Sequence, residues 1–184
     1  MSTTFPRTDK KTLGYNTEQV EAFLSSARRA YNDDDGRNEP GLTAGEIRHT
    51  AFAMQKGGYS PQHVDAALER LEDAFAARER ERAAQEVGEA AWLQEAKANA
   101  RVLTDRLGRS PGHRFARTSL LTIGYNRSDV DRFAGKLVKY FEQGFPVTVD
   151  DVRTAVFRPE RGGYREEQVD AVLDSVVDVM LAVR

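Results

Sequence analysis

Few side chains in this sequence could perform acid–base or metal chemistry. The chain has three histidines, and His49, His63 and His113 lack the spacing of metal ligands. It has no cysteine, which excludes a disulfide, a thiolate zinc site and a cysteine nucleophile. No glycine-rich phosphate loop, nucleophile elbow or helical His-Glu zinc motif occurs in it. We therefore expect no catalytic residue, no metal site and no cofactor.

Three aspartates recur at one position of a repeated segment. Asp65, Asp131 and Asp170 each follow a valine directly. Two carboxyl groups that face each other can act as a general acid and a general base. Because these aspartates recur together with the residues around them, we interpret them as helix caps or structural partners instead.

The segment that contains these aspartates begins with a glycine–tyrosine pair and occurs four times. Its copies read GYNTEQVE, GYSPQHVD, GYNRSDVD and GYREEQVD, and the second and fourth are preceded by another glycine. The turn residues are Gly14, Tyr15, Gly58, Tyr59, Gly124, Tyr125, Gly163 and Tyr164. Each glycine indicates a backbone conformation or a close approach that a side chain would prevent. We expect each tyrosine ring to pack on the following helix with its hydroxyl near water.

A longer period relates the two halves of the chain. Gly14 recurs 110 residues later as Gly124, whereas Gly57 recurs 105 residues later as Gly162. The shift changes because the first half has extra residues in NDDDGRNEPG, which we expect to form a surface loop. We interpret the chain as a duplication, with a first repeat at 1–76, a helical connector at 77–110 and a second repeat at 111–184.

Helix signals dominate both halves. Asn16 is a suitable N-cap, and Gln19 is its expected capping-box partner. Further expected caps are Thr43, Ser60, Asn126 and Thr148. The stretch from about Pro61 to Leu107 is rich in helix-favouring residues, and Gly88 could divide it. Strand signals are almost absent, so we predict an all-α fold.

Charge and hydropathy narrow the function classes. The formal net charge of -2 gives no case for nucleic-acid binding. No apolar run approaches the roughly 20 residues of a membrane-spanning helix. The N-terminal MSTTFPRTDKK lacks the apolar core of a signal peptide. We expect a cytoplasmic chain.

Two segments have a pattern that points to a family. LTAGEIRHTAFAMQKGGYSPQHVDAALERLED and VTVDDVRTAVFRPERGGYREEQVDAVLDSVVD each combine a short helix, a phenylalanine, the glycine–tyrosine turn and a helix with Val-Asp. In this pattern the chain resembles the N-terminal domain of the DivIVA family, in the two-copy form of actinobacterial DivIVA-domain repeat proteins. The modules TLGYNTEQVEAFL and TIGYNRSDVDRFA are similar to its second half.

The resemblance implies a fold and a function. In that family the domain is a non-enzymatic dimer that binds the inner face of the membrane at septa and poles, and it continues into a long coiled coil. For this chain the resemblance implies two tandem DivIVA-like helical repeats joined by a long helical segment. It further implies a role as a cytoplasmic scaffold or adaptor in cell division or polar growth. The implied partners are proteins of the division or growth machinery and an anionic membrane surface. The alternative is a soluble regulator that binds proteins without membrane.

The resemblance also directs attention to the turns. Membrane-binding members expose a phenylalanine and an arginine before the turn, where this chain has Lys56-Gly57 and Arg161-Gly162. The shorter modules offer Leu13 and Ile123 instead. The candidate membrane or partner contacts are Arg7, Lys10, Lys11, Leu13, Arg114, Arg117 and Ile123. A basic residue near anionic lipid contributes about 1 kcal/mol, and the alternative for these charges is ordinary solvated surface.

The family domain is built from two intertwined chains. Each repeat here holds two glycine–tyrosine modules in one chain. We therefore expect an internal pseudo-dimer, and self-association into a homodimer is the alternative.

Overall fold

The computed structural model describes residues 5–32 and 42–183. The segment 32–41, predicted as a surface loop, lies outside these residues except for Asn32. The chain divides into two compact units, Met1–Arg82 and Ala83–Arg184. Within the described residues the elements are seven helices and four three-residue strands, so the mainly helical prediction is confirmed.

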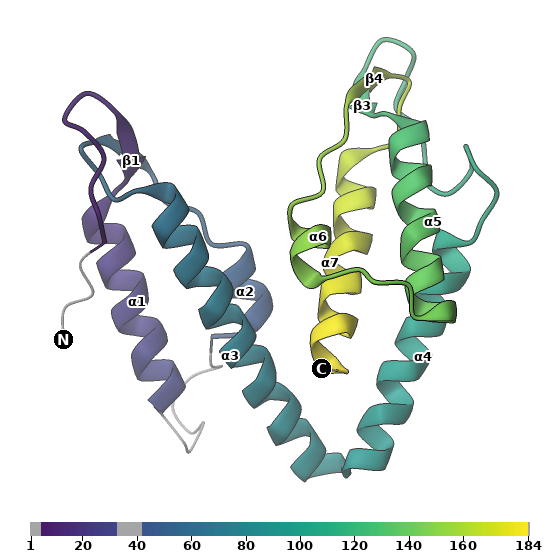
Figure 1. Cartoon of the computed structure of the whole chain (residues 1–184), viewed down its shortest axis with the longest axis horizontal. Helices are drawn as coiled ribbons and strands as arrows, with labels where there is room; N and C mark the ends of the chain where they lie inside the picture. The colour runs from purple at the N-terminus through teal and green to yellow at the C-terminus, as the bar shows by residue number, and fades with distance from the viewer. Residues whose placement is uncertain (1–4, 33–41, 184) are drawn as a thin grey trace. The chain divides into compact units, whose positions relative to one another are not determined.

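The first unit packs two long helices around a short one. Its elements are β1 (Leu13–Tyr15), α1 (Thr17–Asn32), α2 (Ala44–Arg48), β2 (Met54–Lys56) and the start of α3 (Pro61–Val87). Figure 1 shows α1 and α3 running side by side. Phe75 of α3 and Ile47 of α2 are buried together, with Phe23 of α1 packed against them. The expected capping box starts α2, because the Thr43 side chain accepts from the Glu46 amide and the Glu46 side chain accepts from the Thr43 amide.

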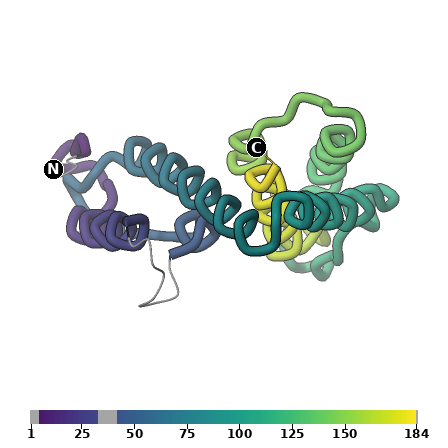
Figure 2. Tube along the Cα trace, turned by 90° about the horizontal axis from the view of Figure 1, so that it is seen from below, coloured from purple at the N-terminus to yellow at the C-terminus, as the bar shows by residue number. Residues whose placement is uncertain are grey.

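The second unit has one helix more. Its elements are α4 (Glu89–Leu107), β3 (Ile123–Tyr125), α5 (Arg127–Gln143), α6 (Val149–Arg153), β4 (Pro159–Arg161) and α7 (Glu166–Ala182). Helix α4 packs against α5 and α7, and α6 packs against α7 (Figure 1 and Figure 2). Leu103 and Leu107 of α4 are buried, as are Leu137 of α5 and Val176 of α7. The second expected capping box, Thr148 with Asp151, starts α6.

The helical stretch predicted for Pro61 to Leu107 is divided at Gly88. This residue lies between α3 and α4 with a φ of 86°, a conformation that side-chain-bearing residues rarely adopt. A Cβ added there would meet no atom within 4 Å, so the backbone conformation alone favours glycine at this position. The prediction that Gly88 could divide the helix is thus confirmed.

The strands were not predicted. In each unit two strands pair antiparallel, with Gly14 opposite Gln55 in one pair and Gly124 opposite Glu160 in the other. Three-residue strands are too short to show an alternating pattern, and glycine, glutamine and glutamate have little strand preference. The strands form because the glycine–tyrosine turns lie against each other, which is a tertiary cause.

Candidate functional site

The two glycine–tyrosine turns of each unit lie against each other. The amide of Tyr15 donates to the carbonyl of Tyr59, and the amide of Tyr59 donates to the carbonyl of Tyr15, both at 2.9 Å. The second unit has the same exchange between Tyr125 and Tyr164, at 3.0 and 2.9 Å. Each module therefore finds its partner module within its own unit.

Glycine is needed at these turns because the backbones touch. A Cβ built on Gly14 would lie 2.5 Å from the carbonyl oxygen of Tyr59, and one on Gly58 would lie 2.7 Å from the carbonyl carbon of Gly14. Both distances are shorter than side-chain contacts allow. The extra glycines have a different role, since Gly57 and Gly162 have φ values of 67° and 65°. Both expected reasons for glycine therefore apply, at neighbouring residues. Gly58 allows the close approach of the backbones, and Gly57 adopts the unusual backbone conformation.

The rings of the turn tyrosines belong to aromatic clusters. Tyr15 and Phe23 both pack edge-to-face on Phe52, with ring centroids 5.5 and 5.8 Å apart. The matching cluster of the second unit consists of Tyr125, Phe133 and Phe157. These contacts hold the first turn of each unit against the start of the helix that follows it.

The tyrosine hydroxyls bind carboxylates of the opposite module. Tyr59 donates to Glu21 at 2.5 Å, and Tyr164 donates to Asp131 at 3.0 Å. Both tyrosines are buried, so the prediction of a hydroxyl near water is wrong for them. The hydrogen bond to Glu21 raises the pKa of Tyr59, whereas burial is the main cause that raises the pKa of Tyr164.

The other two turn tyrosines follow the same rule. The hydroxyl of Tyr125 lies 3.5 Å from Asp170. Burial and a hydrogen bond to Asp65 raise the pKa of Tyr15. Burial also raises the pKa of Asp170. The recurring aspartates are thus structural partners of tyrosine, in agreement with their interpretation from the sequence.

A glutamine before the recurring valine joins the two modules of each unit. Asn16 caps α1 as expected, because its side chain accepts from the Gln19 amide at 2.9 Å. Gln19 does not complete a capping box, since its side chain accepts from the amide of Ala53 across the unit at 2.8 Å. Gln168 accepts likewise from Ala116 at 3.0 Å. The sequence could not reveal this role, because the two groups are far apart along the chain.

The exposed end of the first turn pair is basic. Lys10, Lys11 and Leu13 are exposed, and Lys56 stands opposite Leu13 in the strand pair. The guanidinium carbon of Arg7 lies 5.8 Å from the centre of the Tyr59 ring. We call the exposed set Lys10, Lys11, Leu13 and Lys56 the first tip.

The exposed end of the second turn pair is apolar. Leu120 and Leu121 are 84% and 88% exposed, and Ile123 is 57% exposed. Arg161 stands opposite Ile123 in the strand pair, and both are exposed. We call the set Leu120, Leu121, Ile123 and Arg161 the second tip. The two leucines were not among the contacts predicted from the sequence, although the 110-residue shift places them where the first repeat has Lys10 and Lys11.

The two arginines predicted as contacts at the second turn pair differ in their exposure to solvent. Arg117 is exposed and donates to the carbonyl of Gly112 at 2.9 Å. Arg114 is only 8% exposed, and its guanidinium lies 3.4 Å from an Asp131 carboxylate oxygen and donates to the Arg109 carbonyl. Arg114 is therefore a structural residue and does not belong to an exposed contact surface.

The described residues contain neither a group of metal ligands nor a membrane-spanning helix. No group of three or more histidine, aspartate and glutamate side chains in residues 5–32 and 42–183 could hold a metal ion. No helix in this part of the chain has the length and apolar character needed to cross a membrane. Comparisons of the chain with protein-family models, curated proteins and solved structures gave no match.

Proposed function

We propose that this chain consists of two tandem DivIVA-like helical repeats joined by a long helical segment. The proposal is supported by the contacts that recur in the two units: the tyrosine exchange, the aromatic cluster and the capping box. It assigns the chain a non-catalytic role as a cytoplasmic adaptor in bacterial cell division or polar growth. The engagement of the turn tyrosines with the recurring carboxylates supports a structural use of these groups.

The adaptor associates peripherally with the inner face of the membrane through its tips. The observation that carries this part is the exposure of Leu120 and Leu121. Full burial of a leucine side chain in an apolar medium contributes about 1.5–3 kcal/mol. The lysines of the first tip and Arg161 would add about 1 kcal/mol each near anionic lipid. One tip thus favours apolar insertion and the other favours headgroup attraction.

Vesicle co-sedimentation tests the membrane part. We expect the full chain to sediment with vesicles of phosphatidylglycerol and phosphatidylcholine, and less with phosphatidylcholine alone. Leu120→Ser/Leu121→Ser should abolish sedimentation, whereas Lys10→Glu/Lys11→Glu should weaken only the anionic preference. Val102→Ser is the matched control, because Val102 is an apolar side chain on α4 that is 67% exposed.

The alternative, a soluble regulator of proteins, makes the opposite prediction. A chain that stays in the supernatant with both kinds of vesicle would exclude the membrane role and support this alternative. A fluorescent fusion in an actinobacterium tests the cellular role separately. A signal at septa or poles is expected, and a diffuse signal would contradict it.

A further inference from the structure

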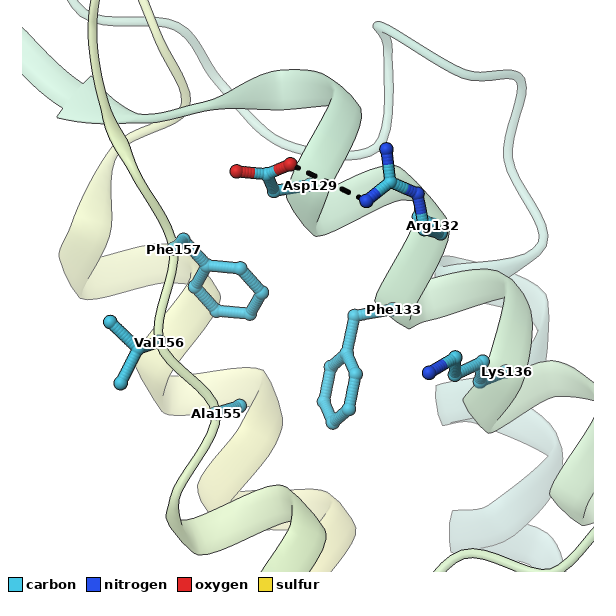
Figure 3. A pocket seen from close by; sticks show the side chains of 7 residues that line it. All are labelled: Asp129, Arg132, Phe133, Lys136, Ala155, Val156 and Phe157. Carbon is cyan, nitrogen blue, oxygen red and sulfur yellow. Dashed lines mark ion pairs between the residues drawn. The ribbon is translucent and has the colours of Figure 1, made fainter.

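A hollow lies on the second unit, away from its tip. It has a volume of about 290 Å³ and lies between α5 and the segment after α6. Its lining residues are Asp129, Arg132, Phe133, Lys136, Ala155, Val156 and Phe157. Figure 3 shows the rings of Phe133 and Phe157 turned toward one another, and their centroids are 5.9 Å apart.

The lining of this hollow combines apolar and charged side chains. Val156 is 90% exposed, although it directly precedes the buried Phe157. In Figure 3 its side chain points away from the ring of Phe133, so the apolar floor of the hollow consists of Phe133 and Phe157.

The same lining carries exposed positive charge. The carboxylate of Asp129 is held by Arg158 through contacts of 2.7 and 2.8 Å, and Arg132 lies 3.7 Å away. The Arg132 side chain is 70% exposed, and Lys136 is exposed one turn further along α5. Hydrogen bonds from Thr148 lower the pKa of Asp151, and the charge of Lys136 adds to this effect. The charged lining residues are thus two cations and one carboxylate, in a chain whose formal net charge is -2.

The first unit supplies an internal comparison. Its equivalents of Phe133 and Phe157 are Phe23 and Phe52, which pack in the same way at 5.8 Å. The positions of Arg132, Lys136 and Val156 are occupied there by Ala22, Ser26 and Ala51. The aromatic pair is therefore part of the fold, whereas the cations and the exposed valine are particular to the second unit.

We propose that this hollow binds an acidic peptide segment of a partner protein, with one apolar side chain seated against the rings of Phe133 and Phe157. The volume is at the lower limit of small-molecule pockets, about 300–1,000 Å³, and suits a single side chain. Carboxylates on either side of that side chain would meet Arg132 and Lys136. The inference rests on the proposed adaptor role, because it names the chemistry of a protein partner.

The test titrates synthetic peptides into the full chain. Binding is measured by NMR, from changes in the amide chemical shifts of the chain. The probe is Glu-Glu-Leu-Phe-Glu-Glu, and the comparison peptides are Glu-Glu-Ser-Ser-Glu-Glu and Lys-Lys-Leu-Phe-Lys-Lys. Only the probe should give saturable shifts, confined to α5 and residues 154–158, and its affinity should fall with added salt. Shifts absent at saturating probe, or equal for the three peptides, would overturn the proposal.

Two variants separate the charge from the apolar contribution. Arg132→Glu/Lys136→Glu should weaken probe binding at least about tenfold. Val156→Asp should do the same, and because Val156 is 90% exposed, the substitution removes no core contact. Arg28→Glu/Arg29→Glu, the same charge change at exposed positions of α1, should bind like the parent chain. Equal probe binding by all variants would reject the site. Because the titration contains no vesicles, a negative result would leave the membrane role untouched.

Discussion

Tyr15 and Tyr59 are each other's backbone partners: each donates its amide hydrogen to the other's carbonyl, at 2.9 Å in both directions. Tyr125 and Tyr164 repeat the arrangement in the second unit. A symmetric dimer would need two chains to make such an exchange, and here one chain supplies both partners. The expectation of an internal pseudo-dimer therefore has a structural counterpart in each unit.

Because these partners are on one chain, we predict a monomer. Light scattering should give a mass near 20.6 kDa. The midpoint of urea unfolding should not move over an about 100-fold dilution, since only an obligate oligomer loses stability with dilution. A dimer whose midpoint falls on dilution would contradict the prediction.

Gly163→Ala should destabilise the second unit strongly. The new Cβ would lie 2.9 Å from the carbonyl oxygen of Glu160 and closer still to that of Tyr125. We expect a loss of about 3 kcal/mol in the free energy of unfolding, measured by urea denaturation. Gly135→Ala is the control: it lies within α5 with no atom within 4 Å of an added Cβ, so it should raise stability by about 0.5–1 kcal/mol.

Tyr164→Phe should lower stability and change its pH dependence. The variant leaves Asp131 without the hydroxyl that donates to it, at a cost of about 1–2 kcal/mol. The pKa of Tyr164 is raised in the folded state, so its contribution is present below the ordinary tyrosine pKa and is lost as pH rises through the folded value. Above pH 9 the free energy of unfolding should therefore fall less steeply with rising pH in the variant than in the parent chain. Identical slopes for the two proteins would contradict this.

Much of the helical framework follows from local signals in the sequence. The capping boxes at Thr43 and Thr148 and the break at Gly88 depend on residues a few positions apart. The tyrosine exchange, the bond from Ala53 to Gln19 and the burial of Arg114 join residues distant in the chain, so no local pattern predicts them. The sequence predicted that the candidate contacts lie at the turns, but it did not predict the exposed leucines. Their exposure depends on the tertiary structure around the turn, which no local pattern reveals.

Asp129 should titrate far below other aspartates. Its hydrogen bonds with Arg158 lower its pKa to about 2. A depressed pKa contributes stability above the unfolded value, and this contribution is lost as pH falls through about 2. Carboxyl carbon shifts should show the low value in the parent chain and a return toward the usual range in Arg158→Gln. An unchanged titration in that variant would show that the pair does not form.

Arg114→Met should reduce stability without changing vesicle binding. The substitution leaves the Asp131 carboxylate, whose side chain is 12% exposed, without its guanidinium partner, which costs about 3 kcal/mol. Arg117→Met, at an exposed position nearby, should leave the unfolding free energy within about 0.5 kcal/mol of the parent. Thermal unfolding and co-sedimentation measure the two effects separately. Equal stability of the two variants would contradict the structural role of Arg114.

The internal pairing of modules has a consequence for how this fold can diverge. In a homodimer every substitution appears on both sides of the symmetry axis. Here the two sides are encoded separately, so a change on one side need not be matched on the other. Gln19 accepts an amide hydrogen from Ala53. In the other module His63 stands at the position of the glutamine, and Pro6, which corresponds to the donor Ala116 of the second unit, has no amide hydrogen. A symmetric pair cannot accumulate such one-sided solutions, and a single chain can.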